Sequence, residues 1–297
     1  MTEPLVDRVI RRQGWLEPIA DVIQKAVDGA YRVLGKPGAA LRSAMHGTRI
    51  FGHPLHPALT DLPVGAWTVG VVADFVAHFS NRIPTEAGDL ALAVGVVGAL
   101  GSVLTGYTDF HDTESHERRV AAAHGLVMTF AVGLDAASLG LRWWAGLNLH
   151  PLAVGLSTAG LGVLFAGAYL GGHVVFGIGT MVDHLAFIAG PHEPVDVGAS
   201  SDFPEGAARC VDAGGMAALV VRRNGVLCAI ADVCTHAGGP LHEGPLDGGV
   251  VTCPWHASRF RIDTGQALRG PATFPQPTFT VREADGQVSL KLRQPST

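Results

Sequence analysis

Residues 234–241, CTHAGGPL, and residues 253–260, CPWHASRF, decide the fold of the C-terminal third of the chain. They supply the pattern Cys234-x-His236, then sixteen residues, then Cys253-x-x-His256. Two thiolates and two imidazoles are the ligands that hold a 2Fe-2S cluster with the cysteines on one iron and the histidines on the other. The sequence therefore predicts an iron-sulfur centre that transfers electrons.

The residues around both ligand pairs are rich in glycine and proline, including Gly238, Gly239, Pro240 and Pro254. Such loops let backbone N–H groups turn toward sulfide and thiolate, which stabilises a reduced cluster. A tetrahedral zinc site is the alternative, because zinc also binds cysteine and histidine. Structural zinc pairs usually repeat one ligand type, whereas each loop here mixes the two. The complete pattern closely resembles the Rieske iron-sulfur family, and the resemblance implies a small all-β domain over residues 191–297.

Departures from the respiratory members of that family indicate a ferredoxin-like subtype. Those members carry one further cysteine in each loop, joined as a disulfide, where this chain has Gly239 and Trp255. The resemblance also implies hydroxyl donors to the sulfurs from a serine and a tyrosine. Ser258 is retained as such a donor, but Phe260 stands in the place of the tyrosine. Losing a donor leaves the reduced state less stabilised, so we expect a lower potential than in a quinol-oxidising centre.

Cysteine usage agrees with a reducing compartment. Only four cysteines occur in 297 residues, and two are assigned as ligands. Cys210 and Cys228 lie in strand-like runs and are expected to be buried, inert thiols. Nothing in the pattern indicates a secreted disulfide framework.

Four long apolar stretches precede the Rieske-like part, at residues 57–79, 90–107, 120–144 and 151–177. Each is long enough to cross a hydrocarbon core of about 30 Å as a helix, and their glycine and alanine content suits close helix packing in lipid. Buried helices of a large soluble protein are the alternative. The sequence predicts a multidomain chain, with an all-α four-helix transmembrane bundle at residues 46–190 followed by the small all-β domain. The Gly-His-Pro-Leu-His-Pro run at residues 52–57 resembles an uncharacterised family of four-span bacterial membrane domains.

Residues 1–45 predict an amphipathic helical segment. Trp15, Ile19, Ile23 and Leu34 recur at helical spacing, so the helix is expected at the membrane surface or against the protein's own soluble domain. No signal peptide is recognised. Eight Lys and Arg residues before the first span and Arg118-Arg119 in the second connection contrast with the single Arg82 and the single Arg142 in the first and third connections. The positive-inside rule therefore predicts a multi-pass protein of the bacterial inner (cell) membrane, with its N-terminus and Rieske-like domain in the cytoplasm.

Histidines near the expected cytoplasmic ends of the spans suggest a second cofactor site. His124 in the third span and His173 near the end of the fourth would reach a similar depth and could ligate a haem b. Another metal, a quinone or a structural role are the alternatives. Four further histidines are expected in the same layer: His53, His56, His111 and His116.

Three ionisable residues are predicted toward the opposite surface, namely Asp74, His78 and Asp135. They could form a proton path, but pairing with Arg82 or Arg142 is the favoured interpretation.

The C-terminal part also predicts two β-hairpins, turning at Asn224-Gly225 and at Asp285-Gly286. The leading hypothesis is a membrane-anchored electron carrier between a cytoplasmic donor and a membrane acceptor, neither of which can be named. A redox or iron-sulfur sensor is the alternative. A Rieske oxygenase component is less favoured, because residues 191–297 leave no room for a mononuclear iron site. The net charge of −5 gives no indication of nucleic-acid binding.

Overall fold

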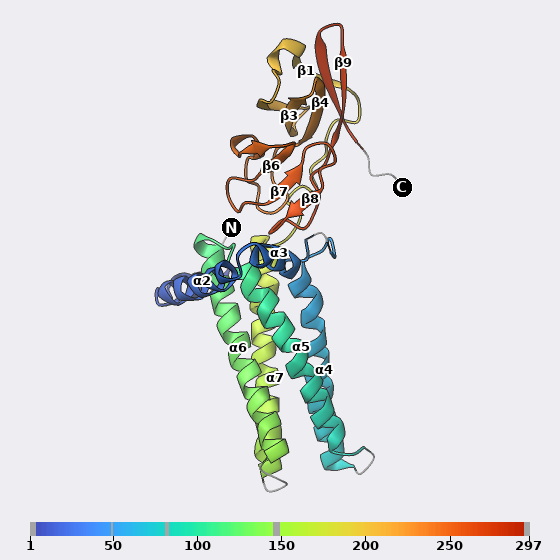
Figure 1. Ribbon diagram of the computed structural model, residues 1–297. Coiled ribbons are helices and arrows are strands. Elements are labelled where there is room, and N and C mark those ends of the chain that lie inside the picture. Colours follow the sequence, from blue (N-terminus) through green and yellow to red (C-terminus); the bar gives the residue numbers. More distant parts are fainter. Residues whose placement is uncertain (1–3, 49, 81–82, 145–148, 294–297) are drawn as a thin grey trace. The chain divides into compact units, whose positions relative to one another are not determined.

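The computed structural model describes residues 4–48, 50–80, 83–144 and 149–293 (Figure 1). The chain forms two compact units. The first comprises Met1–Gly38 and Leu55–Thr180, and the second comprises Ala39–Pro54 and Met181–Thr297. Arg82, on which part of the predicted charge pattern depends, lies outside the described residues.

The first unit is built on four long helices that run side by side (Figure 1). All four are long and apolar enough to cross a membrane, which confirms the predicted four-helix domain. They are α4 (Leu55–Phe79), α5 (Glu86–Phe110), α6 (Ser115–Trp144) and α7 (His150–Gly172), the last continued by the π-helix η2 (His173–Ile178). Each helix begins before the apolar stretch that predicted it. Hydropathy detects only the apolar part of a helix, and the polar residues at its end are helical as well.

Small residues allow the helices to approach closely. A Cβ atom added to Gly95 of α5 would lie 2.2 Å from the ring of Trp67 on α4. A Cβ atom on Gly167 of α7 would meet the sulfur of Met128 on α6 at 2.4 Å. Trp67 is fully buried in the core of this bundle. Glycine therefore sets the spacing between paired helices, as expected for helix packing in lipid.

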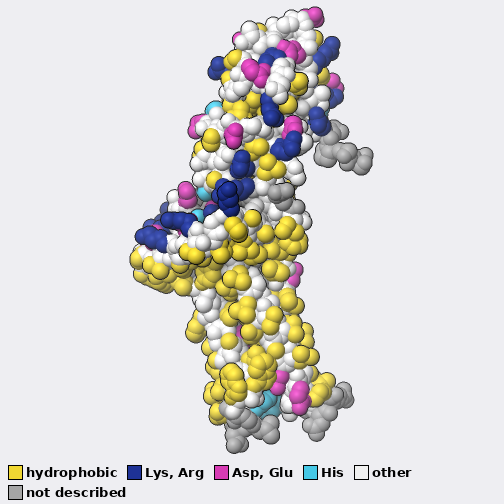
Figure 2. Space-filling view, viewed as in Figure 1, with side chains coloured by type: hydrophobic (Ala, Val, Ile, Leu, Met, Phe, Trp, Pro, Cys, Tyr) yellow, Lys and Arg dark blue, Asp and Glu magenta, His cyan; other side chains and the backbone are white. Residues whose placement is uncertain are grey.

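The predicted N-terminal helix is present as α2 (Leu16–Val33), after the short helix α1 (Leu5–Arg11), and both belong to the first unit. The Gln24 amide donates to three carbonyls at the end of α5 and in the following loop, including that of Thr113 at 3.0 Å. Hydrophobic side chains gather on one face of α2 and Lys and Arg on the opposite face (Figure 2). Val22 and Val33 are among its exposed apolar residues. This is the pattern of a helix lying in a membrane interface.

The segment before α4 belongs to the second unit, unlike the predicted boundary at residues 45 and 46. Helix α3 (Gly35–Met45) crosses from one unit to the other. The Ser43 hydroxyl accepts the Gly270 amide at 3.1 Å, and the Thr48 hydroxyl donates to the Ala272 carbonyl at 2.9 Å. These long-range hydrogen bonds leave no periodic signal in the sequence, so the composition alone could not place the segment. The second unit also begins at Met181, ten residues before the predicted start.

The remainder of the second unit is the predicted all-β domain, with three antiparallel sheets. The first sheet has the order β1 (Val195–Ala199), β10 (Gln287–Leu292), β9 (Phe279–Ala284). The second has the order β2 (Ala208–Asp212), β3 (Ala217–Arg223), β4 (Val226–Ala231). The third has the order β5 (Leu246–Asp247), β6 (Val250–Thr252), β7 (Arg259–Arg261), β8 (Ala267–Arg269). Short 3-10 turns lie at Ser200–Asp202 (η3) and Leu241–Glu243 (η4).

Both predicted hairpins are confirmed. Asn224 and Gly225 have φ angles of 51° and 76°, and Asp285 and Gly286 have 53° and 75°. Positive φ at both central residues is the requirement of a type I′ turn, whose twist matches that of the flanking strands.

Candidate functional site

The two Cys-His motifs lie on loops that repeat the same backbone hydrogen bonds. In residues 234–239, the first ligand loop, the Cys234 amide donates to Gly239 at 2.9 Å and the Gly238 amide donates to Cys234 at 2.9 Å. In residues 253–258, the second ligand loop, the Cys253 amide donates to Ser258 at 2.8 Å and the Ala257 amide donates to Cys253 at 3.1 Å. The first loop follows β4, and the second joins β6 to β7. Each cysteine thus starts a closed turn of the same size.

Positive φ angles close both turns. Gly238 has a φ angle of 81°, and Ala257, at the matching place in the second loop, has 58°. Alanine rarely adopts this left-handed conformation, because its Cβ crowds the backbone. The repeated hydrogen bonds therefore hold the second loop in a conformation that its sequence does not favour.

The two cysteine thiols face each other. Cys234 and Cys253 are both buried, with 1% and 3% of their surface exposed. The hydrogen bond between the thiols raises the pKa of Cys234 and lowers the pKa of Cys253 to about 6, and the backbone amides of Trp255 and His256 also favour the Cys253 thiolate. The backbone amides of His236 and Ala237 point at Cys234 in the same way. Amides aimed at both sulfurs are the arrangement expected around thiolates that bind a cluster.

The two histidines complete the ligand set. The ring centroids of His236 and His256 are 4.9 Å apart, and their planes are inclined by 83°. Both side chains are half-buried, whereas the two cysteines are buried. Two inner thiols and two outer imidazoles converge as the donors of a 2Fe-2S centre with mixed ligation require. These residues therefore fit such a cluster.

Gly239 and Trp255, at the places of the absent disulfide, are in close contact. A Cβ atom on Gly239 would lie 2.8 Å from Sγ of Cys253 and 3.1 Å from the Trp255 ring. The Trp255 side chain is 55% exposed. The absence of a side chain at Gly239 thus leaves room for the Trp255 indole against the first loop.

Ser258 and Phe260 differ in the contacts they make. The Ser258 hydroxyl is buried and accepts the Ala272 amide at 2.9 Å. Phe260 is fully buried in the apolar core beneath the ligand loops, opposite Val251 in the β6–β7 ladder. The ring of Phe260 offers no hydrogen-bond donor. Ser258 thus supplies a hydroxyl group in the second ligand loop, whereas Phe260 supplies none.

The membrane-domain histidines are engaged in two separate groups. His124 Nδ1 contacts the Gly167 carbonyl at 2.8 Å, and its ring lies 6.3 Å from that of His56. His173 Nε2 and His116 Nε2 both contact one oxygen of Asp7, at 2.9 and 2.7 Å. The predicted pairing of His124 with His173 around a haem b gains no support from these contacts. His53 belongs to the second unit, and His111 lies beside Asp112.

Asp7 was not identified from the sequence, although two histidines meet on it. Burial favours its neutral form, but the hydrogen bonds from His116 and His173 outweigh this effect and lower the pKa of Asp7 overall. No local motif links Asp7 with residues more than one hundred positions away, so only the fold brings them together.

The favoured interpretation of Asp74 is confirmed. Both oxygens of Asp74 accept hydrogen bonds from Arg142, at 3.0 and 2.6 Å, and Arg142 also donates to Asp89 at 2.8 Å. Asp135 does not share this network. Its buried carboxylate oxygens have no hydrogen-bond partner within the described part of the chain.

The two remaining cysteines lie in the expected strands, β2 and β4, but they are not both buried. Cys210 is exposed and Cys228 is half-exposed. The strand-like run around Cys210 predicts burial, but β2 is an edge strand, and Arg209 and Cys210 in it are exposed. Although the residue is exposed, partial desolvation of its sulfur and the nearby Asp232 carboxylate raise the pKa of Cys210 to about 11.

Two protein families match the chain in succession. A family described as "Predicted membrane protein (DUF2231)" matches residues 52–184, and the Rieske [2Fe-2S] domain family matches residues 193–280. Ferredoxin CarAc of Metapseudomonas resinovorans is 41% identical over 91 residues, covering 30% of this chain and 85% of the relative. The 3-phenylpropionate/cinnamic acid dioxygenase ferredoxin subunit of Escherichia coli (strain K12) is 39% identical over 93 residues, covering 31% and 87%.

Solved structures described as ferredoxins, or as complexes that contain one, are also similar. A chain from the complex of reduced oxygenase and oxidized ferredoxin in carbazole 1,9a-dioxygenase is 33% identical, with coverage of 35% of this chain and 99% of that chain and a TM-score of 0.33. The Sphingomonas yanoikuyae B1 ferredoxin is 29% identical, with coverage of 35% and 100% and a TM-score of 0.32. By sequence, motif and site geometry, the chain belongs to the Rieske [2Fe-2S] domain family, and the part that precedes this domain matches the DUF2231 family of predicted membrane proteins.

Proposed function

We propose that this protein is a membrane-anchored, ferredoxin-like Rieske electron carrier. Cys234 and Cys253 would bind the inner iron of a 2Fe-2S cluster, and His236 and His256 the outer iron. The observation that carries this proposal is the convergence of two buried thiols and two half-buried imidazoles on loops with the same hydrogen-bond pattern. When bound, the cluster supplies a one-electron redox couple. The chain's own part is to aim backbone amides at the thiolates and to leave the imidazole edge open to a partner.

Membrane anchoring is supported by the first unit. Four helices are long and apolar enough to cross a membrane, and hydrophobic side chains cover much of the visible face of this bundle (Figure 2). The exposed apolar face of α2 adds an interfacial element. The Lys and Arg distribution favours a cytoplasmic position for the N-terminus and the Rieske domain. Trypsin treatment tests this orientation, since it should degrade the C-terminal domain in inverted vesicles and spare it in right-side-out ones.

The electron path is tested best in the membrane. Inverted vesicles that contain the full chain are supplied with NADH and soluble cell extract, and the reduced cluster is followed by electron paramagnetic resonance. A soluble quinone analogue is then added. We expect a signal that appears with the extract and disappears with the quinone. A cluster that is reduced but is re-oxidised neither by quinone, nor by the membrane, nor by a soluble protein fraction would contradict the carrier role and favour a sensor.

An oxygenase component is a second candidate for the acceptor. It is favoured by one observation, the similarity to a protein described as a dioxygenase ferredoxin subunit. The same vesicle experiment distinguishes the two, because re-oxidation that needs a soluble protein fraction and oxygen instead of quinone would indicate an oxygenase.

A further inference from the structure

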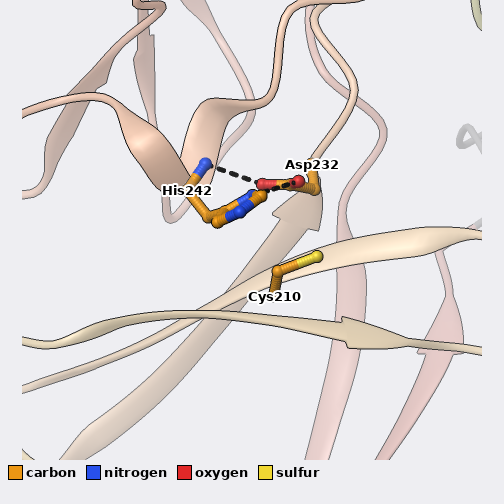
Figure 3. A group of neighbouring side chains, drawn as sticks. All are labelled: Cys210, Asp232 and His242. Carbon is orange, nitrogen blue, oxygen red and sulfur yellow. Dashed lines mark hydrogen bonds and ion pairs between the residues drawn. The ribbon is translucent and has the colours of Figure 1, made fainter.

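Cys210, Asp232 and His242 form a second group of potential metal ligands in the Rieske domain, separate from the two ligand loops (Figure 3). Cys210 lies on β2, Asp232 directly follows β4, and His242 lies on η4. One ligand atom from each residue lies within 4.8 Å of the other two. Three elements that are separate in sequence thus bring a thiol, a carboxylate and an imidazole together.

The carboxylate of this group is held in a defined orientation. Asp232 is only 3% exposed. One of its oxygens accepts the backbone amide of His242 at 2.8 Å, and the other contacts Nδ1 of the His242 ring at 2.6 Å. The backbone hydrogen bond does not depend on the side chain of residue 242. One carboxylate oxygen is therefore fixed, and the other is directed at the imidazole beside the thiol.

The donor set points to zinc more than to other common cations. Zinc accepts sulfur, nitrogen and oxygen ligands together, whereas magnesium and calcium prefer oxygen alone. In a tetrahedral zinc site the ligand atoms are roughly 3.3–3.6 Å apart. His242 Nδ1 and the nearer Asp232 oxygen, 2.6 Å apart here, therefore need to separate by roughly 1 Å and exchange their hydrogen bond for the metal, whereas the Cys210 sulfur, within 4.8 Å of the other ligand atoms, needs to approach by roughly 1 Å at most. The exposure of Cys210 and the half-burial of His242 leave solvent access for a water molecule as fourth ligand.

We propose that Sγ of Cys210, one carboxylate oxygen of Asp232 and Nδ1 of His242 bind a zinc ion, with water in the fourth position. On binding, the thiol proton of Cys210 is released to solvent, and the imidazole carries its proton on Nε2. A carboxylate oxygen of Glu243 lies 4.0 Å from Nε2, so a movement of about 1 Å would bring it within hydrogen-bond distance of that proton. A ligating imidazole commonly donates its other N–H to a carboxylate in this way.

The test uses the full-length protein, purified in detergent with its iron-sulfur cluster. Protein samples are dialysed against zinc ions, and iron and zinc are measured together by mass spectrometry. The variants are C210S and H242Q, and the matched control is C228S, which removes a thiol from β4, a strand of the same sheet that lies outside the group. Asp232 is left unchanged, because it lies close to Cys234 in the chain.

We expect roughly one zinc ion per chain in the unchanged protein and in C228S, with their iron content and visible absorption unaffected by zinc. C210S and H242Q should lose this zinc and keep their iron. Zinc binding that is equal in all four proteins would overturn the site. So would a cluster-containing protein that binds no zinc, since the group would then be a structural hydrogen-bonded pair beside a thiol. Iron in the same samples reports on the ligand loops independently.

Discussion

The hydroxyl of Thr48 donates a hydrogen bond to the carbonyl of Ala272, 2.9 Å away, and so ties the segment before α4 to the site. The Ala272 amide in turn donates to the Ser258 hydroxyl at 2.9 Å, and the Ser258 carbonyl accepts the Cys253 amide at 2.8 Å. Three consecutive hydrogen bonds therefore connect residue 48 with a proposed iron ligand. Residues 39–54, which precede α4, therefore act as a structural part of the second unit, the one that contains the Rieske domain.

Replacing Thr48 by valine should weaken this connection. T48V removes the donor to a buried carbonyl, and a lost hydrogen bond of this kind costs about 1 kcal/mol. We expect the Rieske unit to unfold at a lower denaturant concentration, which loss of the cluster absorption would report. The control is T280V on β9, where the side chain is exposed and valine suits a strand. Equal midpoints for T48V and the unchanged protein would show that the segment does not support the site.

Gly239 should tolerate no side chain. In G239A the new Cβ would lie 2.8 Å from Sγ of Cys253 and also press on the Trp255 ring. Overpacking of this kind costs roughly 1–3 kcal/mol, and here the strain falls on a proposed ligand. We expect less iron per purified chain. G29A on α2 is the matched control, because its Cβ would meet nothing within 4 Å. An unchanged iron content in G239A would argue against the close contact of Gly239 with Cys253.

Phe260 should help to keep the redox potential low. F260Y adds a hydroxyl beneath the ligand loops, and a hydrogen bond to a cluster or ligand sulfur stabilises the reduced state. A gain of about 1–1.5 kcal/mol corresponds to a rise of roughly 40–60 mV for a one-electron couple. Redox titration of samples with equal iron content measures the shift. F279Y, in the other core of the unit, serves as the control. An intact F260Y cluster with an unchanged or lower potential would contradict this explanation.

Glu17 should attach the N-terminal helices to the bundle in a pH-dependent way. Hydrogen bonds from Arg119 and Arg118 lower the pKa of Glu17 below its usual 4.5. A carboxyl with a lowered pKa contributes its full stabilisation above the unfolded value, and the contribution is lost as the pH falls through the folded value. At neutral pH, E17Q should imitate this loss, which we expect to be about 1 kcal/mol.

The measurement for Glu17 is limited proteolysis in detergent. Cleavage within α2 should accelerate on the order of fivefold in E17Q at neutral pH, and the rate in the unchanged protein should rise toward the same value as the pH falls from 4.5 through the lower folded pKa of Glu17. E86Q is the control, since Glu86 is exposed at the start of α5. The same cleavage rate in E17Q and E86Q would rule out a role for Glu17 in attachment.

The sequence predicted those features whose signals are local. Cys234 and His236 stand two residues apart, and Asn224-Gly225 specifies its own turn, so the ligand loops and the hairpins could be identified before the fold was known. The apolar lengths of α4 to α7 are equally local. Thr48 and Ala272 are separated by 224 positions, and Cys210, Asp232 and His242 lie on β2, directly after β4 and on η4. Such contacts depend on how the strands and loops pack, and no spacing rule anticipates them.

The central claim is that two cysteines and two histidines hold a 2Fe-2S cluster in a membrane protein. The most direct test measures iron, acid-labile sulfide and visible absorption of the full chain purified from the membrane fraction. We predict two irons and two sulfides per chain, bound in the unchanged protein and lost in C234S and C253S, with an absorption that dithionite bleaches reversibly. Zinc at the ligand loops without sulfide, or recovery of the protein only from the soluble fraction, would contradict the account.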